Sequence, residues 1–170
     1  MRFTRSCGIL LHPTSLPGRY GIGDLGQSAY QFVDYLATSK QSLWQILPLG
    51  PTGYGDSPYQ CFSAFAGNPL LISPDMMIEA GYLPADVVAL VPPFPTHKVD
   101  YGWVIDYKNK LFDKAFAHFQ QKGTAVQKAA FTGSSRRRRN APADLMLSIT
   151  VEDVCAACDT ILRREAWRAA

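Results

Sequence analysis

The side chains best suited to binding chemistry gather in one stretch, from Leu43 to Pro74, which is expected to form a buried strand, a long loop and a second short apolar run. The loop alternates large flat rings with short polar groups, which are Tyr54, Asp56, Ser57, Tyr59, Gln60, Phe62, Phe65 and Asn68. Aromatic faces pack against the CH faces of sugar rings, while hydroxyl, amide and carboxylate groups bind the hydroxyls at the ring edges. The loop therefore indicates carbohydrate binding. The alternative is an ordered surface loop packed on its own aromatic residues.

Two segments that precede this stretch, together with the apolar run that begins it, predict a βαβ unit. Residues 8–11 and 43–49 are short apolar runs, expected to form two buried strands. Between them, residues 27–39 carry apolar side chains at spacings of three and four, which is typical of an amphipathic helix. Strand, helix and strand in this order predict a parallel sheet with a right-handed crossover.

Binding sites in parallel sheets lie where the carboxyl ends of the strands open into loops. The aromatic loop follows the second strand and His12 follows the first, so we expect both at one edge of the sheet. For His12, structural hydrogen bonding is favoured over a chemical role. The motif GIGDLG, from Gly21 to Gly26, matches a dinucleotide-binding pattern only superficially, because a proline-rich segment precedes it instead of a strand. We therefore expect no cofactor, and no cluster of metal ligands stands out.

The second half of the sequence favours helices. Asp75 is the expected N-cap of a short helix over residues 76–80, and residues 84–90 are expected to form another. Residues 104–121 predict an amphipathic helix that ends at Gly123. The side chains of this helix expected to face water are Lys108, Lys110, Lys114 and Lys122.

The composition is that of a soluble globular protein of 170 residues with a net charge of +3. We interpret the basic run at residues 136–139 as a solvated linker and expect no nucleic-acid partner. No apolar stretch approaches the ~18 residues of a membrane span. No signal peptide is expected, which predicts a reduced, cytoplasmic setting. Cys155 and Cys158 form an isolated CxxC in a helical pattern, where two incidental cysteines are favoured over a zinc or redox site.

Several of these segments together resemble one enzyme family. HPTSLPG, YGIGDLG, QILPLGPTGYGDSPYQ and FSAFAGNPLLI follow one another in order, and VDYG stands further on, from Val99 to Gly102. In this order they closely resemble the amino-terminal segment of amylomaltases, the 4-α-glucanotransferases that are called disproportionating enzymes in plants. The resemblance extends over about residues 5–131 and fades at Gly133.

The resemblance implies a fold and a reaction. The family fold is a (β/α)8 TIM barrel, and an ordinary barrel needs ~250 residues, so this α/β chain is expected to form an incomplete barrel with an inserted subdomain. The family transfers α-1,4-glucan segments between maltooligosaccharides by a retaining mechanism, which uses two carboxylates about 5–5.5 Å apart. The family motifs that supply these carboxylates are not found in this sequence. No catalytic residue is therefore assigned, and the chain alone is expected to be inactive.

The resemblance also implies residues that bind glucans. Tyr54 and Tyr101 are similar to family tyrosines on which glucan rings pack, including a groove remote from the reaction. Asp56, Ser57 and Tyr59 are similar to residues that orient the sugar on the donor side of the cleft, although for Tyr59 a packing role is the alternative. Further candidates are His12, Gln60 and Asn68. The expected partners are α-1,4-glucans and maltooligosaccharides, with no metal implied.

On this basis the sequence divides into three parts. Residues 1–133 form the glucanotransferase-like part, residues 134–142 a basic linker expected to be disordered, and residues 143–170 a divergent helical tail. A frameshift, a degraded gene and a chimeric end each account for the change after Gly133. A non-catalytic carbohydrate-binding remnant, or a truncated pseudogene product, is the alternative to a glucanotransferase function.

Overall fold

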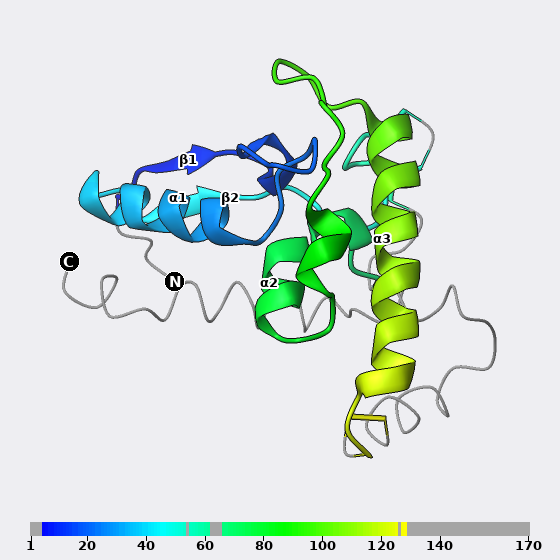
Figure 1. The fold of residues 1–170 in the computed structure, drawn as a ribbon. Coiled ribbons are helices and arrows are strands. Elements are labelled where there is room, and N and C mark those ends of the chain that lie inside the picture. Colours follow the sequence, from blue (N-terminus) through cyan, green and yellow to red (C-terminus); the bar gives the residue numbers. More distant parts are fainter. Residues whose placement is uncertain (1–4, 54, 62–65, 126, 129–170) are drawn as a thin grey trace.

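The computed structural model describes residues 5–53, 55–61, 66–125 and 127–128 (Figure 1). The predicted linker and tail at residues 134–170, with Cys155 and Cys158, lie outside the described residues, as do Tyr54, Phe62 and Phe65. The described elements, in chain order, are β1 (Gly8–Leu10), the 3₁₀ turn η1 (Pro13–Ser15), α1 (Gln27–Thr38), β2 (Leu43–Gln45), η2 (Pro69–Leu71), α2 (Pro74–Glu79), η3 (Ala85–Val88) and α3 (Tyr101–Lys122).

β1 and β2 form a parallel pair that α1 connects. Gly8 lies opposite Leu43, and Leu10 lies opposite Gln45. α1 runs along this pair in Figure 1, and the Phe32 ring of α1 meets the Trp44 ring of β2 edge-on, with 5.0 Å between the ring centroids. The buried residues of α1 are Ala29, Val33 and Leu36. These observations confirm the predicted strand–helix–strand unit and its parallel pairing.

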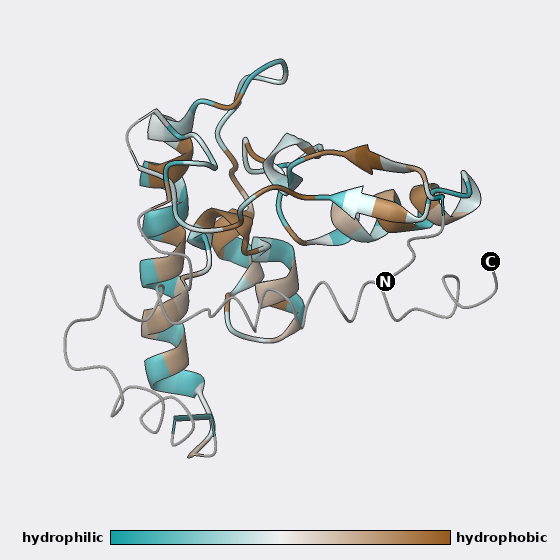
Figure 2. Cartoon of the chain, turned by 180° about the vertical axis from the view of Figure 1, so that it is seen from behind, coloured by the Kyte–Doolittle hydropathy of each residue, from teal (hydrophilic) through white to brown (hydrophobic). Residues whose placement is uncertain are grey.

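The expectation that both strands are buried is wrong. Leu10 and Leu43 are each 56% exposed, although Figure 2 shows β1 as strongly hydrophobic. Two strands and one connecting helix cannot enclose both faces of a sheet, so apolar strand residues stay in contact with water. β2 also ends earlier than predicted, at Gln45, because Leu47 leaves the extended conformation with a φ of +62° and Pro48 has no N–H to donate.

The core is built around residues 16–25, the segment that leads into α1. Leu25 packs with α1 residues, Tyr20 packs with Leu111 of α3, and Ile22 packs with Val104 of α3. Gly23 has no room for a side chain, because a Cβ there would lie 2.2 Å from the carbonyl oxygen of Pro13. The glycines of GIGDLG therefore serve close packing of the core.

α2 is capped by a different residue from the one predicted. Ser73 is the N-cap, since its Oγ accepts a hydrogen bond from the Met76 N–H (3.5 Å). The prediction of Asp75 was wrong because Pro74 occupies the first helical position, which makes the preceding residue the cap. The helix predicted over residues 84–90 is instead the short turn η3.

α3 is the longest described helix and starts earlier than predicted. The Asp100 carboxylate accepts a hydrogen bond from the Trp103 N–H (3.1 Å), so the helix begins at Tyr101 instead of Val104. It ends at Gly123, as predicted. Neither α3 nor any other helix in the described part of the chain is long and apolar enough to cross a membrane.

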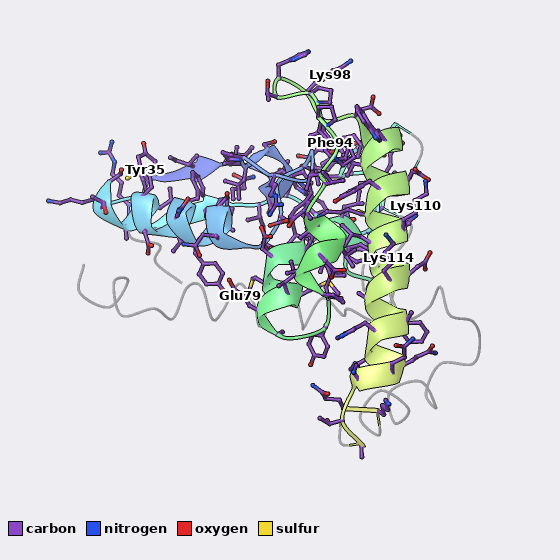
Figure 3. The ribbon with its side chains drawn as sticks, in the orientation of Figure 1. Tyr35, Glu79, Phe94, Lys98, Lys110 and Lys114 are labelled. Atoms are coloured by element: carbon purple, nitrogen blue, oxygen red, sulfur yellow. The ribbon has the colours of Figure 1, made fainter. Side chains whose placement is uncertain are left out.

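The lysines of α3 do not all face water. Lys110 and Lys114 are exposed and point away from the neighbouring elements in Figure 3. The expectation for Lys108 is wrong, because this side chain is fully buried. It lies on the face of α3 that also buries Val104 and Leu111.

Candidate functional site

Residues 52–61, which we call the site loop, close on themselves; Tyr54 of this loop lies outside the described residues. Thr52 and Cys61 pair as an isolated antiparallel bridge. The Gly53 N–H donates to the Gln60 carbonyl (3.0 Å), and the Gln60 N–H donates to the Ser57 carbonyl (3.0 Å). This closure brings together four of the predicted site residues, which are Asp56, Ser57, Tyr59 and Gln60.

The side chains of the site loop are open to solvent. Tyr59 is 72% exposed, which argues against the alternative that its ring packs into the protein. Gln60 is also exposed, and Asp56 and Ser57 are partly exposed. Asp56 has a φ of +53°, a left-handed conformation that aspartate adopts more readily than most residues. The loop therefore presents a carboxylate, a hydroxyl, an aromatic ring and an amide within five consecutive residues.

His12 connects the loops that follow β1 and β2. Its Nδ1 accepts a hydrogen bond from the Thr14 N–H (3.3 Å) and lies 2.7 Å from the Thr14 hydroxyl. The proton therefore belongs on Nε2, which donates to the Pro48 carbonyl (3.2 Å). Burial lowers the pKa of His12 below 6.5 and favours this neutral form. The contact confirms that the two loops meet at one edge of the sheet, and it gives His12 the structural hydrogen bonding that the sequence favoured.

Asn68 lies where the chain returns from the site loop towards β2. Its side chain is buried, with the residue 3% exposed, and its Oδ1 accepts a hydrogen bond from the Leu70 N–H (2.9 Å) to cap η2. The Asn68 N–H donates to the Leu49 carbonyl (3.0 Å). His12 and Asn68 thus hold neighbouring carbonyls of the segment that leaves β2. Both residues therefore hold the chain on either side of the site loop in place, through hydrogen bonds made within the protein.

Tyr101 reaches this region from α3. It is partly buried and packs against the cluster of Ile22, Leu70 and Val104. Leu70 follows Asn68 by two positions, so Tyr101 adjoins the stretch of chain that descends from the site loop. The structure therefore places the described site residues in three positions. Four lie in the site loop itself, and His12 lies at the start of the chain that leads to it. Asn68 and Tyr101 lie where the chain returns from the site loop, which we call the base of the loop.

The sequence reasoning missed a buried ion pair beneath this base. The Lys108 ammonium donates to the carbonyls of Leu70 (2.6 Å) and Ile72 (2.9 Å) and lies 3.8 Å from the Asp24 carboxylate. Burial lowers the pKa of Lys108 to about 8, although the Asp24 charge opposes this shift. Burial likewise raises the pKa of Asp24, against the effect of Lys108.

A positional signal for this buried lysine is present in the sequence. Lys108 follows Val104 by four residues and precedes Leu111 by three, which places it on the apolar stripe of α3. Lysine is so often exposed that its residue type predicts exposure even at this position.

A separate cavity of about 790 Å³ lies between residues 14–23 and residues 91–99. Phe94 and Arg19 contribute to its lining, and none of the predicted site residues does. The Arg19 guanidinium is held by the Val88 carbonyl (2.7 Å) and lies 3.6 Å from the Asp75 carboxylate. Within the described ranges no group of three or more His, Cys, Asp or Glu side chains is placed to hold a metal ion.

A parallel βαβ unit whose carboxyl-end loops meet, one of them carrying exposed aromatic and polar side chains, is typical of α/β proteins that bind ligands at that edge. The family model for glycoside hydrolase family 77, described as 4-alpha-glucanotransferase, matches residues 11–142. The chain therefore belongs to this family, which confirms the resemblance found in the sequence. The match extends past Gly133, where the sequence resemblance fades.

Individual relatives agree with the family assignment. A 4-alpha-glucanotransferase of Synechocystis sp. is 58% identical over 116 residues, which are 68% of this chain and 23% of the relative. One of Thermus thermophilus is 47% identical over 137 residues, 81% of this chain and 27% of the relative. The solved amylomaltase from Streptococcus agalactiae in complex with acarbose matches with a TM-score of 0.71 and 36% identity, over 80% of this chain and 27% of that one. The chain thus spans about a quarter of the length of these proteins.

Proposed function

We propose that this chain forms part of the glucan-binding surface of a 4-α-glucanotransferase, which transfers α-1,4-glucan segments between maltooligosaccharides. The observation that carries the proposal is the site loop, which offers Asp56, Ser57, Tyr59 and Gln60 to solvent on the stretch of chain that follows β2. Membership of glycoside hydrolase family 77 supports the substrate class. A cytoplasmic setting belongs to the same proposal.

The fold that we propose for the whole enzyme is a (β/α)8 barrel, of which residues 1–133 supply the first strands. The βαβ unit is the repeating element of such a barrel. The exposed leucines Leu10 and Leu43 support the packing of further elements on this face of the sheet. The outer edges of the two-stranded sheet support further strands beside the pair, because a closed barrel leaves no open edges.

We assign no catalytic residue to this chain and propose that it is inactive alone. A retaining transferase needs a nucleophilic carboxylate and a separate acid/base carboxyl group. The carboxylates of Asp24 and Asp100 already have structural partners, because Asp24 pairs with Lys108 and Asp100 caps α3. Release of glucose from maltotriose by the purified chain would contradict this part of the proposal.

The roles that we propose for the binding residues follow the family resemblance and, for the described residues, their positions; Tyr54 lies outside the described residues. Asp56, Ser57 and Tyr59 orient the sugar on the donor side, and Gln60 adds an amide at the same turn. Tyr54 and Tyr101 give glucan rings a surface to pack on. His12 and Asn68 contribute indirectly in this proposal, since each holds a carbonyl at the start of the loop.

Titration of the full chain with maltoheptaose tests the binding function. Trp44 and Trp103 report through their fluorescence, and we expect a saturable change at millimolar sugar. Tyr59→Ala should weaken binding by about 2–10-fold, since an aromatic packing contact contributes about 0.5–1.5 kcal/mol. Tyr35→Ala is the matched control, because Tyr35 is a comparably exposed tyrosine on α1 (Figure 3). A flat titration of the unmodified chain would refute glucan binding.

A further inference from the structure

Lys108 is held in a buried niche by two hydrogen bonds and one ion pair. Two donors reach backbone carbonyls, at Leu70 and Ile72, and the third direction faces the Asp24 carboxylate. The residue has no exposed surface. Three separate parts of the chain therefore meet at one ammonium group: α3, the η2 segment, and the turn before α1.

The carbonyls that Lys108 holds lie at the end of the chain stretch that carries the site loop. That stretch leaves β2, passes through residues 52–61 and returns at Asn68, whose N–H donates to the Leu49 carbonyl. η2 follows immediately, and Asn68 caps it. Lys108 thus attaches the returning end of the site-loop stretch to α3.

Tyr101 lies on the same helix and on nearly the same face as Lys108. The two residues are seven positions apart on α3, which corresponds to about two turns and about 10 Å along the helix axis. Tyr101 also packs against the cluster that contains Leu70, the residue whose carbonyl Lys108 binds. A shift of α3 along its axis would therefore move Tyr101 relative to the site loop.

Stability alone does not account for a lysine at this position. Apolar side chains of similar volume often stabilise a core as well as a buried ion pair does, because they avoid the cost of removing charges from water. Buried polar groups instead fix the register of packed elements in the best-attested cases. An ammonium with two directed hydrogen bonds and an ion pair fixes the position of α3 along the η2 segment, which a methionine at the same place would not do.

Given the glucan-binding function proposed above, we propose that Lys108 is a positioning residue for long glucans. By holding the carbonyls of Leu70 and Ile72 and the Asp24 carboxylate, it fixes Tyr101 relative to the site loop so that one glucan chain contacts both. Lys108 itself touches no substrate. A short glucan that occupies the site loop alone does not depend on this register.

Calorimetric titration of the full chain with maltotriose and with maltoheptaose tests the proposal. In the unmodified chain the longer sugar should bind more tightly, because its second contact adds to the first. In Lys108→Met the ratio of the maltotriose Kd to the maltoheptaose Kd should fall by about 2–10-fold, because that factor corresponds to the loss of one aromatic packing contact. The affinity for maltotriose should stay the same. Lys110→Met is the matched control, since Lys110 is exposed on the same helix and its ammonium pairs with Asp106 of the same helix (2.7 Å). An unchanged preference in Lys108→Met overturns the proposal.

A double-mutant cycle with Tyr101→Ala separates positioning from a general loss of stability. If Lys108 acts through Tyr101, Lys108→Met should have no further effect on maltoheptaose binding in the Tyr101→Ala background. Additive effects overturn the proposal.

Circular dichroism checks that each variant is folded. If Lys108→Met is unfolded, Asp24→Asn takes its place, because it removes the charge but keeps an oxygen for the Gly26 N–H. An unmodified chain that binds neither sugar refutes the proposed function itself, and so differs from a failure confined to Lys108.

Discussion

At the scale of single residues, the buried amine of Lys108 couples folding to pH. Burial lowers its pKa from 10.5 to about 8 in the folded chain, where Asp24 is the charged group that faces it. In the unfolded chain the amine returns to its ordinary pKa. Between pH 8 and 10.5 the unfolded chain therefore binds more protons at this residue than the folded chain does. The contribution of Lys108 to the free energy of unfolding should rise across this window and be lost as pH falls through about 8.

Urea denaturation from about pH 7 to about pH 10 measures this contribution. The difference in unfolding free energy between the unmodified chain and Lys108→Met should shift in favour of the unmodified chain as pH rises. Lys110→Met should follow the unmodified chain, since its amine is exposed. A difference that does not change with pH would show that Lys108 keeps the same pKa in both states.

Residue types predicted the site loop well and the residues beneath it poorly. Tyr59 and Ser57 stand in a segment dense in turn residues, and such a segment places side chains at the surface, where the structure has them. Asn68 belongs to the same stretch between Leu43 and Pro74, yet it is buried and caps η2. Whether a polar residue next to a proline faces solvent or caps a turn depends on the backbone around it, which sequence spacing alone does not define.

At the scale of elements, the start of α3 depends on one side chain. Asp100 caps the helix, and Tyr101 is the first helical residue. Asp100→Ala should lower the free energy of unfolding by about 1 kcal/mol, the usual cost of losing an N-cap. Asp106→Ala on the same helix should cost only about 0.3–0.5 kcal/mol, because it removes an exposed ion pair with Lys110. Urea denaturation followed at the helical circular dichroism signal compares the two. Equal losses would mean that the cap adds nothing beyond a surface charge.

Helical elements were more predictable than strand ends and caps. Apolar spacing identified α1 and most of α3, because one face of each helix packs on the core. The end of β2 was missed because it follows from the left-handed conformation of Leu47, and nothing in the identity of a leucine predicts a positive φ. The cap of α2 was missed because an acidic residue in the first turn and a true N-cap have similar sequence signatures, and Pro74 decides between them.

At the scale of the whole molecule, the sheet leaves apolar surface in contact with water. Both strands have free edges in the described part of the chain, since each pairs only with the other there. Such edges are templates for pairing with further strands.

We predict that the isolated chain self-associates through β1 and β2. Leu10→Lys combined with Leu43→Lys should weaken this association at least about tenfold, because burying a leucine contributes roughly 1.5–3 kcal/mol and about half of each side chain is available for burial. Leu90→Lys is the control, since Leu90 is exposed but lies outside the strands. Sedimentation velocity across a range of protein concentrations gives the result. A chain that is monomeric without substitutions, and that melts in one sharp cooperative transition, would show that two strands and one helix suffice to protect the sheet. In that case the exposed leucines would give no reason to expect further strands beside them.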